Sequence, residues 1–292
     1  PQEANELFRI MRDLTAQGVS IIFITHKLKE VLAVADRIGV LRGGKMVGTA
    51  EPQTSTEASL AELMVGRSVI LTVDKEKAQP AELVLKVTNL YVKDDRNHMT
   101  VKGVDLEVHA GEIVGIAGVQ GNGQRELVEA LTGLRAVEDG RITIADVDST
   151  HYTPRQNTEL GVAHIPEDRE KHGLVMAYTL SDNMVLNNYY LKPYASGIFM
   201  NKEAIVENGT RLVKEFDVRP PNPLTTAGKL SGGNKQKVIV AREFSRPTKL
   251  LIAAQPTRGI DVGSIEFIHN QIVAQRDQGA AVLVVSAELD EV

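Results

Sequence analysis

The chain has 292 residues, which is enough for one large domain or for one domain and part of another. Its 33 basic and 38 acidic residues give a formal net charge of −5, so there is no electrostatic basis for wrapping a nucleic acid. The absence of cysteine excludes disulfides, zinc–cysteine sites and thiol catalysis, and it fits a reducing cytoplasm. No apolar run is long enough to span a bilayer and no signal-peptide pattern opens the chain, so we expect a soluble protein that reaches a membrane only through a partner.

The first quarter of the chain alternates between helical and strand patterns. Apolar residues at helical spacing predict a helix that ends at Gly18. After it we expect, in chain order, a buried strand over residues 19–24, a helix over 28–35, a hairpin of 37–42 with 45–48 around Gly43-Gly44, and a short helix near 60–64. The charged stretch that follows, at residues 74–82, is the predicted linker.

A second unit begins at residue 83. Its first expected elements are strands over 83–87 and 101–108, a buried strand over 112–117, a helix over 126–131 and a strand over 141–145. A mostly helical middle from 152 to 223 follows, then a helix after residue 231, a strand over 250–254, a helix over 265–276 and a buried strand over 281–285. Strands that alternate with helices predict an α/β domain with a largely parallel sheet.

An internal repeat indicates the domain organisation. Residues 17–31 align with residues 278–292. The positions that recur are Gln17, Gly18, Leu28, Glu30 and Val31, which correspond to Gln278, Gly279, Leu289, Glu291 and Val292. We therefore expect a fragment of a tandem protein, cut at both ends: residues 1–73 are the C-terminal part of one domain, 74–82 a linker, and 83–292 a second domain truncated at its C-terminus.

Residues 230–237, Leu-Ser-Gly-Gly-Asn-Lys-Gln-Lys, are the first candidate for a phosphate contact. Ser231, Gly232, Gly233 and Asn234 stand directly before an apolar helical run. A helix that begins this way presents unpaired backbone N–H groups and the positive end of its dipole. The alternative is an ordinary helix N-terminus that Ser231 caps.

A second glycine-rich stretch lies between a predicted strand and a predicted helix, where a phosphate-binding loop belongs. Its candidate residues are Gly118, Gly121, Asn122, Gly123, Gln124, Arg125 and Glu126. Gln124 occupies the lysine position of that motif, and Arg125 occupies the position of the Mg²⁺-binding Ser or Thr. An ordinary glycine turn is the alternative. A dinucleotide fingerprint is disfavoured, because its third glycine would fall on Glu126.

Residues 230–237 resemble the signature motif of ABC-transporter ATPases, in the form typical of sugar and nucleoside importers. Other stretches resemble further motifs of that family at the required spacing. Residues 250–261 resemble the Walker B strand and the turn after it, with Ala254 and Gln255 in place of the family's Asp and Glu. Glu167 occupies the Q-loop position, and Asp261 lies in the turn, the D-loop, that couples two cassettes.

The resemblance implies the position of a catalytic histidine. In the family a histidine follows the strand after Walker B, and the repeat places His26 there in the first copy and Ala287 in the second. A lone histidine at a strand end is usually structural, but Thr25-His26 at this point of the repeat favours the catalytic interpretation.

The resemblance also implies the fold: a P-loop ATPase domain of the ABC type, with a mainly parallel sheet, an antiparallel β subdomain and a helical subdomain that carries the signature, preceded by the C-terminal part of another such domain. Cassettes of this family pair head to tail. Ser231, Gly232 and Gly233 are therefore expected to close over ATP held by the first cassette, with His26 at its γ-phosphate.

The second cassette is expected to be catalytically degenerate. Phosphoryl transfer depends on positioned charge, and here the lysine, both Mg²⁺-organising groups, the acid and the histidine are all replaced. The resemblance thus implies ATP as the cofactor with Mg²⁺ at the consensus site only. Arg125 is a candidate for a remaining contact to phosphate.

The branch that this sequence resembles most imports nucleosides. The resemblance implies an ATPase subunit at the cytoplasmic face of the cell membrane, with membrane permeases as partners, a solute-binding lipoprotein as an indirect partner and no nucleic acid. The fragment alone is expected to be inactive. The alternatives are a non-transport ABC ATPase and a structural cassette that binds permease without nucleotide.

The remaining aromatic and histidine residues carry weaker signals. Tyr91 is a candidate for adenine stacking, with a strand-end tyrosine as the alternative. Six histidines show no metal-ligand spacing, and we expect no metal site in this chain: His98, His109, His151, His164, His172 and His269.

Overall fold

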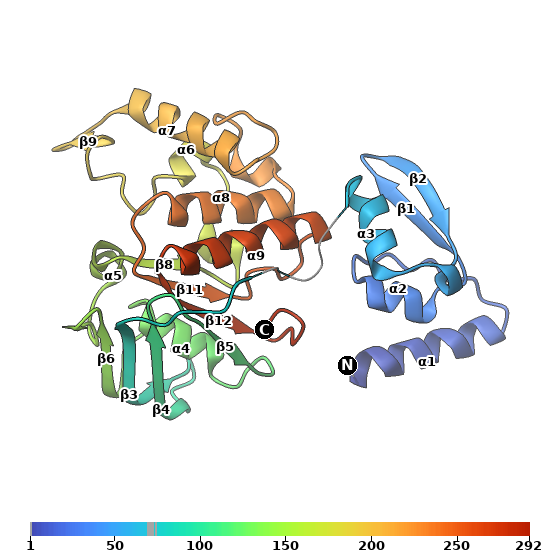
Figure 1. The fold of residues 1–292 in the computed structure, drawn as a ribbon, viewed down its shortest axis with the longest axis horizontal. Helices are drawn as coiled ribbons and strands as arrows, with labels where there is room; N and C mark the ends of the chain where they lie inside the picture. The colour runs from blue at the N-terminus through green and yellow to red at the C-terminus, as the bar shows by residue number, and fades with distance from the viewer. Residues whose placement is uncertain (1, 69–72, 74) are drawn as a thin grey trace. The chain divides into compact units, whose positions relative to one another are not determined.

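A computed structural model describes residues 2–68, 73 and 75–292 of the protein. These residues form two compact units (Figure 1). The first contains the described residues up to Val73 together with Asp261–Glu266, and the second contains the rest. Of the predicted linker, residues 75–82 carry no helix or strand, and Asp74 lies outside the described residues.

The first unit contains helices and one hairpin. Its elements are α1 (Gln2–Ala16), α2 (Leu28–Val34), β1 (Ile38–Arg42), β2 (Lys45–Ala50), the short 3₁₀ helix η1 (Pro52–Thr54) and α3 (Glu57–Val65). The predicted hairpin is confirmed, since β1 pairs antiparallel with β2 across Gly43-Gly44. Leu28, Ile38, Val40 and Leu60 are buried together and form a small apolar core.

The buried strand predicted over residues 19–24 is wrong. This segment is not a strand, and Ile22 and Ile24 are 92% and 91% exposed. In the part of the chain that the structure describes, no strand pairs with it. A strand of a parallel sheet depends on hydrogen bonds to its neighbours, so an apolar run without neighbours does not form one.

The second unit contains two four-stranded sheets. One is antiparallel, in the order β4–β3–β6–β7, from β4 (Met99–His109), β3 (Leu83–Lys93), β6 (Asp139–Ile144) and β7 (Val147–Asp148). The other is parallel, in the order β5–β12–β11–β8, from β5 (Ile113–Ala117), β12 (Ala281–Ser286), β11 (Leu250–Ala254) and β8 (Val162–Ile165). The predicted α/β fold with a parallel sheet is confirmed.

The main apolar core joins both sheets to α4 (Gln124–Leu131). Leu90 and Ile142 contribute from the antiparallel sheet, Leu250 and Leu283 from the parallel sheet, and Leu131 from the helix. All residues of β11 and β12 are buried, because these central strands have a strand on each side and are covered on both faces.

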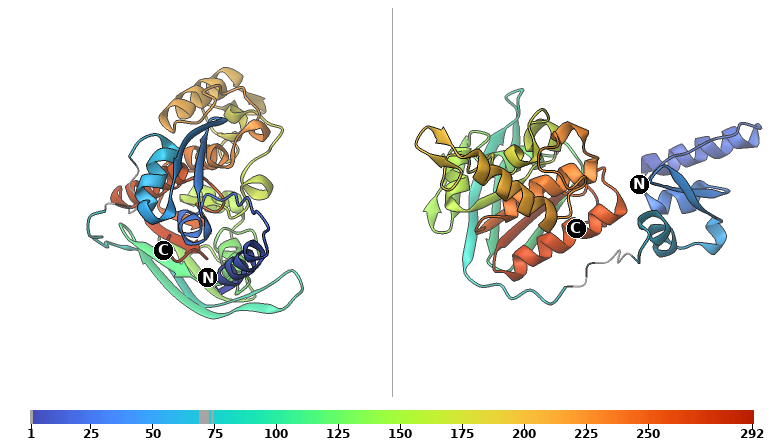
Figure 2. Two further views of the ribbon diagram at one scale, coloured as in Figure 1. Left: turned by 90° about the vertical axis from the view of Figure 1, so that its right-hand side faces the viewer. Right: turned by 90° about the horizontal axis from the view of Figure 1, so that it is seen from above.

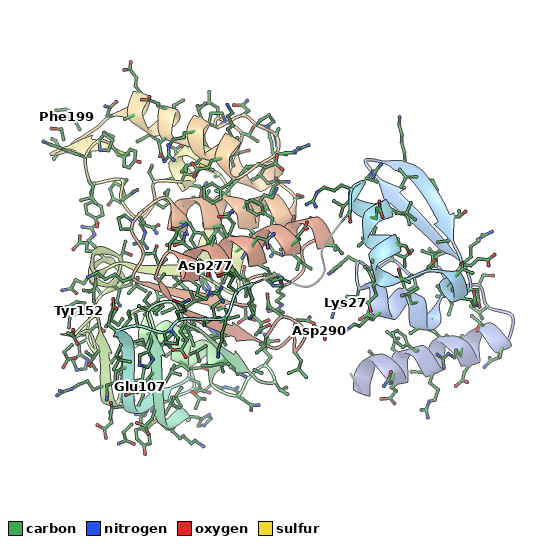
Figure 3. All side chains as sticks on the ribbon, viewed as in Figure 1. Lys27, Glu107, Tyr152, Phe199, Asp277 and Asp290 are labelled. Atoms are coloured by element: carbon green, nitrogen blue, oxygen red, sulfur yellow. The ribbon has the colours of Figure 1, made fainter. Side chains whose placement is uncertain are left out.

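Further helical segments lie beside the parallel sheet or pack on the helices next to it. They are α5 (Pro154–Leu160), the π-helical turn η2 (Arg169–Gly173), α6 (Leu180–Asn183), α7 (Lys202–Glu215), the 3₁₀ turn η3 (Ala227–Lys229), α8 (Gly232–Phe244) and α9 (Val262–Asp277). In Figure 1 and in the left view of Figure 2, α6 and α7 lie on the opposite side of this unit from the antiparallel sheet. A short hairpin of β9 (Ala195–Ser196) and β10 (Phe199–Met200) precedes α7, and Figure 3 places Phe199 at its outer tip.

Two expectations for the second unit need correction. The middle, predicted to be mostly helical, contains the core strand β8, whose four residues are too few to show a periodic pattern. The strand predicted over 112–117 forms as β5, but it is not buried: it stands at the edge of the parallel sheet, and Gly115 and Ala117 are exposed.

Among the described residues, every helix is too short or too polar to cross a membrane.

Candidate functional site

The loop between β5 and α4 has the strand–loop–helix arrangement of a phosphate-binding loop. It runs over residues 118–123, and Gly123 is the N-cap of α4. Gly121 and Gly123 have φ angles of 93° and 94°, which glycine adopts without strain. A Cβ on Gly123 would stand 2.9 Å from the Thr100 carbonyl oxygen, so this position requires glycine. A Cβ on Gly121 would have no other atom within 4 Å.

The side chain of Gln124, at the lysine position, folds back over this loop. Its Nε2 donates to the Val119 carbonyl oxygen at 2.9 Å, and its Oε1 accepts from the Asn122 N–H at 3.0 Å. Nε2 also lies so close to Gly118 that a Cβ there would clash with it. One side chain therefore satisfies both a donor and an acceptor of the loop backbone.

Arg125, at the position of the Mg²⁺ ligand, is engaged in ion pairs. Its Nε donates to Glu129 at 2.7 Å, and its Nη2 lies 3.7 Å from a carboxylate oxygen of Asp95. Arg135 approaches both carboxylates to 2.7 Å. The hydrogen bond and the charge of Glu129 raise the pKa of Arg125. The carboxyl of Glu126 belongs to the same first turn of α4, so the helix start carries both signs of charge.

A chain of side chains connects this loop to the loops after β8 and β11. Glu167, after β8, accepts from Gln120 Nε2 at 2.9 Å and is ion-paired with Arg258, after β11. These loops stand at the carboxyl ends of parallel strands, which is where open α/β sheets bind ligands. The predicted Q-loop residue is thus in contact with the predicted phosphate loop.

The positions where the resemblance expects Asp, Glu and His hold none of these groups. Ala254 ends β11 and is 6% exposed. Gln255 follows with a φ of 48°, and its N–H donates to the Val285 carbonyl oxygen at 2.8 Å. Ala287 is exposed after β12. No group of three His, Cys, Asp or Glu side chains within the described ranges is arranged to hold a metal ion.

The signature residues stand at the start of α8. Ser231 is the N-cap, but its side chain makes no capping hydrogen bond. Its Oγ instead accepts from Asn234 Nδ2 at 3.0 Å, while Asn234 Oδ1 accepts from the Arg219 N–H at 2.7 Å. Since the first N–H groups of a helix have no intrahelical partner, Gly232 and Gly233 begin α8 without help from a side-chain cap.

Arg169 is a site residue that the sequence did not single out. Its guanidinium donates to the carbonyl oxygens of Arg258 at 2.8 Å and of Gly259 at 3.2 Å. It also packs against Gly232, where a Cβ would lie 3.4 Å from its Nη2. Burial lowers the pKa of Arg169. Together with Glu167 and Arg258, this residue forms a continuous path from the loop at β5 to the signature at α8.

The remaining predicted residues lie elsewhere. His26 is exposed and follows Thr25, whose Oγ1 donates to Glu30 at 3.2 Å. Asp261, at the start of α9, accepts from the N–H and the hydroxyl of Ser264 at 3.0 and 2.8 Å. Tyr91 lies inside β3 rather than at its end. His26 and Asp261 belong to the first unit, whereas the loop, Glu167 and the signature belong to the second.

A cavity of about 300 Å³, which the sequence did not predict, opens beside β8 and α5. Glu243 lines it and binds Arg242, Arg246 and Asn187 at 2.9, 3.0 and 2.8 Å. Burial acts to raise the pKa of Glu243, but the two guanidinium groups and the amide outweigh it and lower the pKa to about 2. The sequence signal was the Arg-Glu-x-x-Arg spacing directly after the apolar run of residues 238–241.

His164 lines the same cavity from β8. Among the described residues, its buried Nε2 has no hydrogen-bond partner. Burial lowers the pKa of this imidazole to about 4, so it stays neutral near pH 7.

A glycine-rich loop after a parallel strand, a second glycine-led helix and an added antiparallel sheet define a nucleotide-binding ATPase cassette. Residues 101–258 match the family model described as ABC transporter, and the chain belongs to this family.

Solved structures share this cassette fold. The dimeric structure of MJ0796, a bacterial ABC transporter cassette, aligns with a TM-score of 0.60 at 20% identity over 71% of this chain and 89% of that one. The ADP conformation of MJ1267 aligns with a TM-score of 0.58 at 20% identity over 72% and 84%.

Curated relatives are similar along the whole chain. It is 50% identical to the nucleoside import ATP-binding protein NupA of Lactococcus lactis subsp. cremoris, over 100% of this chain and 58% of the relative. It is 49% identical to the guanosine import ATP-binding protein NupO of Bacillus subtilis, over 100% and 57%. The glucose import ATP-binding protein TsgD13 of Haloferax volcanii is 47% identical over 100% and 54%. The chain thus spans a little over half the length of these relatives.

Proposed function

We propose that this chain is part of the ATP-binding subunit of an ABC importer of nucleosides. The observation that carries the proposal is the likeness to nucleoside and guanosine import proteins at 49–50% identity over the whole chain. In this proposal residues 83–292 are a second, degenerate cassette, residues 74–82 are a linker, and residues 1–73 are the C-terminal part of a first cassette. Sugar uptake is the second candidate, and the 47% identity to a glucose import protein favours it.

The second cassette binds nucleotide weakly and does not hydrolyse it. Gln124 brings no charge to the loop, Arg125 is held by Glu129 and Asp95, and Ala254 and Gln255 offer no carboxylate. Loss of one preorganised electrostatic contact typically costs about 10²–10³ in rate, and several are missing here. Mg²⁺ belongs to the consensus site only. The self-contained contacts of the loop also favour the alternative of a structural cassette without nucleotide.

The second cassette instead supplies its signature to the consensus ATP site. Ser231, Gly232 and Gly233 face the phosphates of ATP held by the P-loop of the first cassette, with the α8 dipole adding positive potential. His26 contacts the γ-phosphate in that site, and Asp261 couples the two cassettes. The hydroxyl of Ser231 supports this role, because its oxygen makes no capping bond and accepts from Asn234, while its O–H can donate to a ligand.

The partners in this proposal are two membrane permeases, with a solute-binding lipoprotein upstream of them. The subunit works at the cytoplasmic face of the membrane. Nothing in the charge of −5 favours a nucleic-acid partner.

The first experiment measures ATP binding and hydrolysis by this chain, with and without Mg²⁺. The proposal expects weak binding that does not depend on Mg²⁺ and no turnover. Mg²⁺-dependent turnover that survives purification would overturn the assignment of a degenerate site. Co-purification with permeases, followed by uptake of labelled guanosine against labelled glucose, tests the transporter assignment and separates nucleosides from sugars.

A further inference from the structure

We infer that Gln124 closes the loop at β5 against phosphate by acting as an internal ligand of its backbone. The inference rests on the proposal that this loop is a degenerate nucleotide site. It is carried by the Gln124 amide, which accepts from the Asn122 N–H at 3.0 Å and donates to the Val119 carbonyl oxygen at 2.9 Å.

The chemistry of the amide explains why a glutamine does this and a lysine does not. Phosphate-binding loops hold anions with backbone N–H groups. A lysine side chain carries only donors, so it leaves such N–H groups open. A glutamine carries an acceptor oxygen as well, and in this structure that oxygen occupies the Asn122 N–H. The substitution therefore removes a positive charge and also places a competitor at a donor of the loop.

The position of the amide supports competition rather than assistance. Its Nε2 packs against Gly118, where a Cβ would clash with it, so the side chain lies over the loop itself. The same Nε2 donates to the Val119 carbonyl oxygen, which leaves Oε1 on the Asn122 N–H. A phosphate that takes the Asn122 N–H must first displace the Gln124 oxygen.

The cations near the loop do not offset this competition. Arg125 is bound to Glu129, and Arg258 is bound to Glu167, whose carboxylate also accepts from Gln120 of the loop. An incoming anion thus meets neutralised guanidinium groups and an occupied backbone donor.

The decisive variant is Gln124→Ala, because alanine suits the first turn of a helix and adds no contact of its own. If Gln124 competes with phosphate, this variant binds ATP more tightly than the unmodified chain in EDTA, by about fivefold for one net hydrogen bond released. If the amide instead contacts the nucleotide, the variant binds more weakly. Titration calorimetry of the full chain with ATP distinguishes the two, and unchanged or weaker binding overturns the inference.

Two controls separate the contact from general effects. Gln278→Ala removes an exposed glutamine far along the chain in the turn after α9, and it should bind ATP as the unmodified chain does. Gln120→Ala removes the bond to Glu167 but neither bond of Gln124.

Hydrogen exchange of the loop gives a readout that needs no nucleotide. The backbone N–H of Asn122 should exchange slowly in the unmodified chain and in the Gln120→Ala variant. It should exchange faster in the Gln124→Ala variant. Equal exchange rates of this N–H in all three chains would show that the hydrogen bond to Gln124 does not protect it, which overturns the inference. Faster exchange without tighter ATP binding would mean that Gln124 stabilises the loop but does not compete with phosphate. That result also overturns the inference, while the permease experiment still decides the proposed function.

Discussion

The two copies of the internal repeat share a turn and differ in the strand that follows it. At the end of α1, the Val19 N–H donates to the Leu14 carbonyl oxygen at 3.1 Å and the Gly18 N–H donates to that of Thr15 at 2.9 Å. At the end of α9 the matching bonds are formed from Ala280 to Gln275 at 3.0 Å and from Gly279 to Arg276 at 2.8 Å. Both are Schellman motifs, and the two glycines have φ angles of 86° and 95°.

After this turn the copies diverge. Residues 281–286 form β12, which pairs with β5 on one side and β11 on the other and is buried throughout. Residues 19–24 form no strand, and two of their isoleucines are almost fully exposed. The residues near a helix end determine its geometry, whereas a strand forms only where other strands pair with it. The two similar sequences therefore form the same turn, but only the second copy forms a strand.

The largest expected effect concerns the residues after these segments, His26 and Ala287. If His26 has the proposed catalytic role, His26→Ala should lower ATP turnover of the proposed transporter by about 100- to 1000-fold, because it removes the proposed contact to the γ-phosphate. Phosphate release by the complex with its permeases measures this. The mirror change Ala287→His should add no turnover, since Gln124, Ala254 and Gln255 still lack the required groups. A wild-type rate in His26→Ala would contradict the catalytic role.

A pair of core changes sharpens the comparison next. Leu283 is fully buried in β12, and Ile22 stands at the matching position of the first copy. Leu283→Ala should cost about 3 kcal/mol of unfolding free energy, while Ile22→Ala should cost less than about 0.5 kcal/mol. Urea unfolding followed by circular dichroism measures both. Equal costs would mean that the first segment is buried in solution.

Acid should weaken the unit that contains β12. The pKa of His164 in that sheet falls from 6.5 to about 4 in the folded chain, so below pH 6.5 the unfolded chain takes up the proton first and stability falls. At pH 5 the loss should be about 2 kcal/mol, at about 1.4 kcal/mol per pH unit. Glu243, with a pKa lowered from 4.5 to about 2, extends the loss below pH 4.5.

The acid effect is measured by urea unfolding between pH 7.5 and 5. In His164→Gln the slope over that range should nearly disappear. A slope that persists in this variant would place the acid sensitivity in another group.

The smallest expected effect concerns the shared turn. Gly18→Ala and Gly279→Ala place a side chain at positive φ, with no atom near enough to clash in either copy. Each should cost about 1 kcal/mol from backbone strain alone, and the two costs should agree. A clear difference between them in urea unfolding would show that the turns depend on the strands after all.

The sequence predicted the elements whose causes are local and missed those whose causes are distant. The hairpin around Gly43-Gly44, the helix after Ser231 and the strand β11 followed from turn glycines and apolar runs. The strand β8 was missed because its four residues are too few to show a periodic pattern. Residues 19–24 were misassigned because a strand also needs neighbours to pair with. At the candidate site, motif position singled out Gln124 and Glu167, whose functional roles stay predictions. It did not single out Arg169, because the contacts of this residue to Arg258 and Gly259 join residues that are far apart in sequence.

The exposed isoleucines of residues 19–24 bear on the behaviour of this 292-residue chain in concentrated solution. Within the described residues no strand pairs with this apolar run, and such a run is a template for a strand from another molecule. We expect self-association to begin at Ile22 and Ile24, to grow with protein concentration, and to be visible by light scattering before any loss of secondary structure. A charged residue at Ile22 or Ile24 should therefore prolong the lifetime of the monomer on storage.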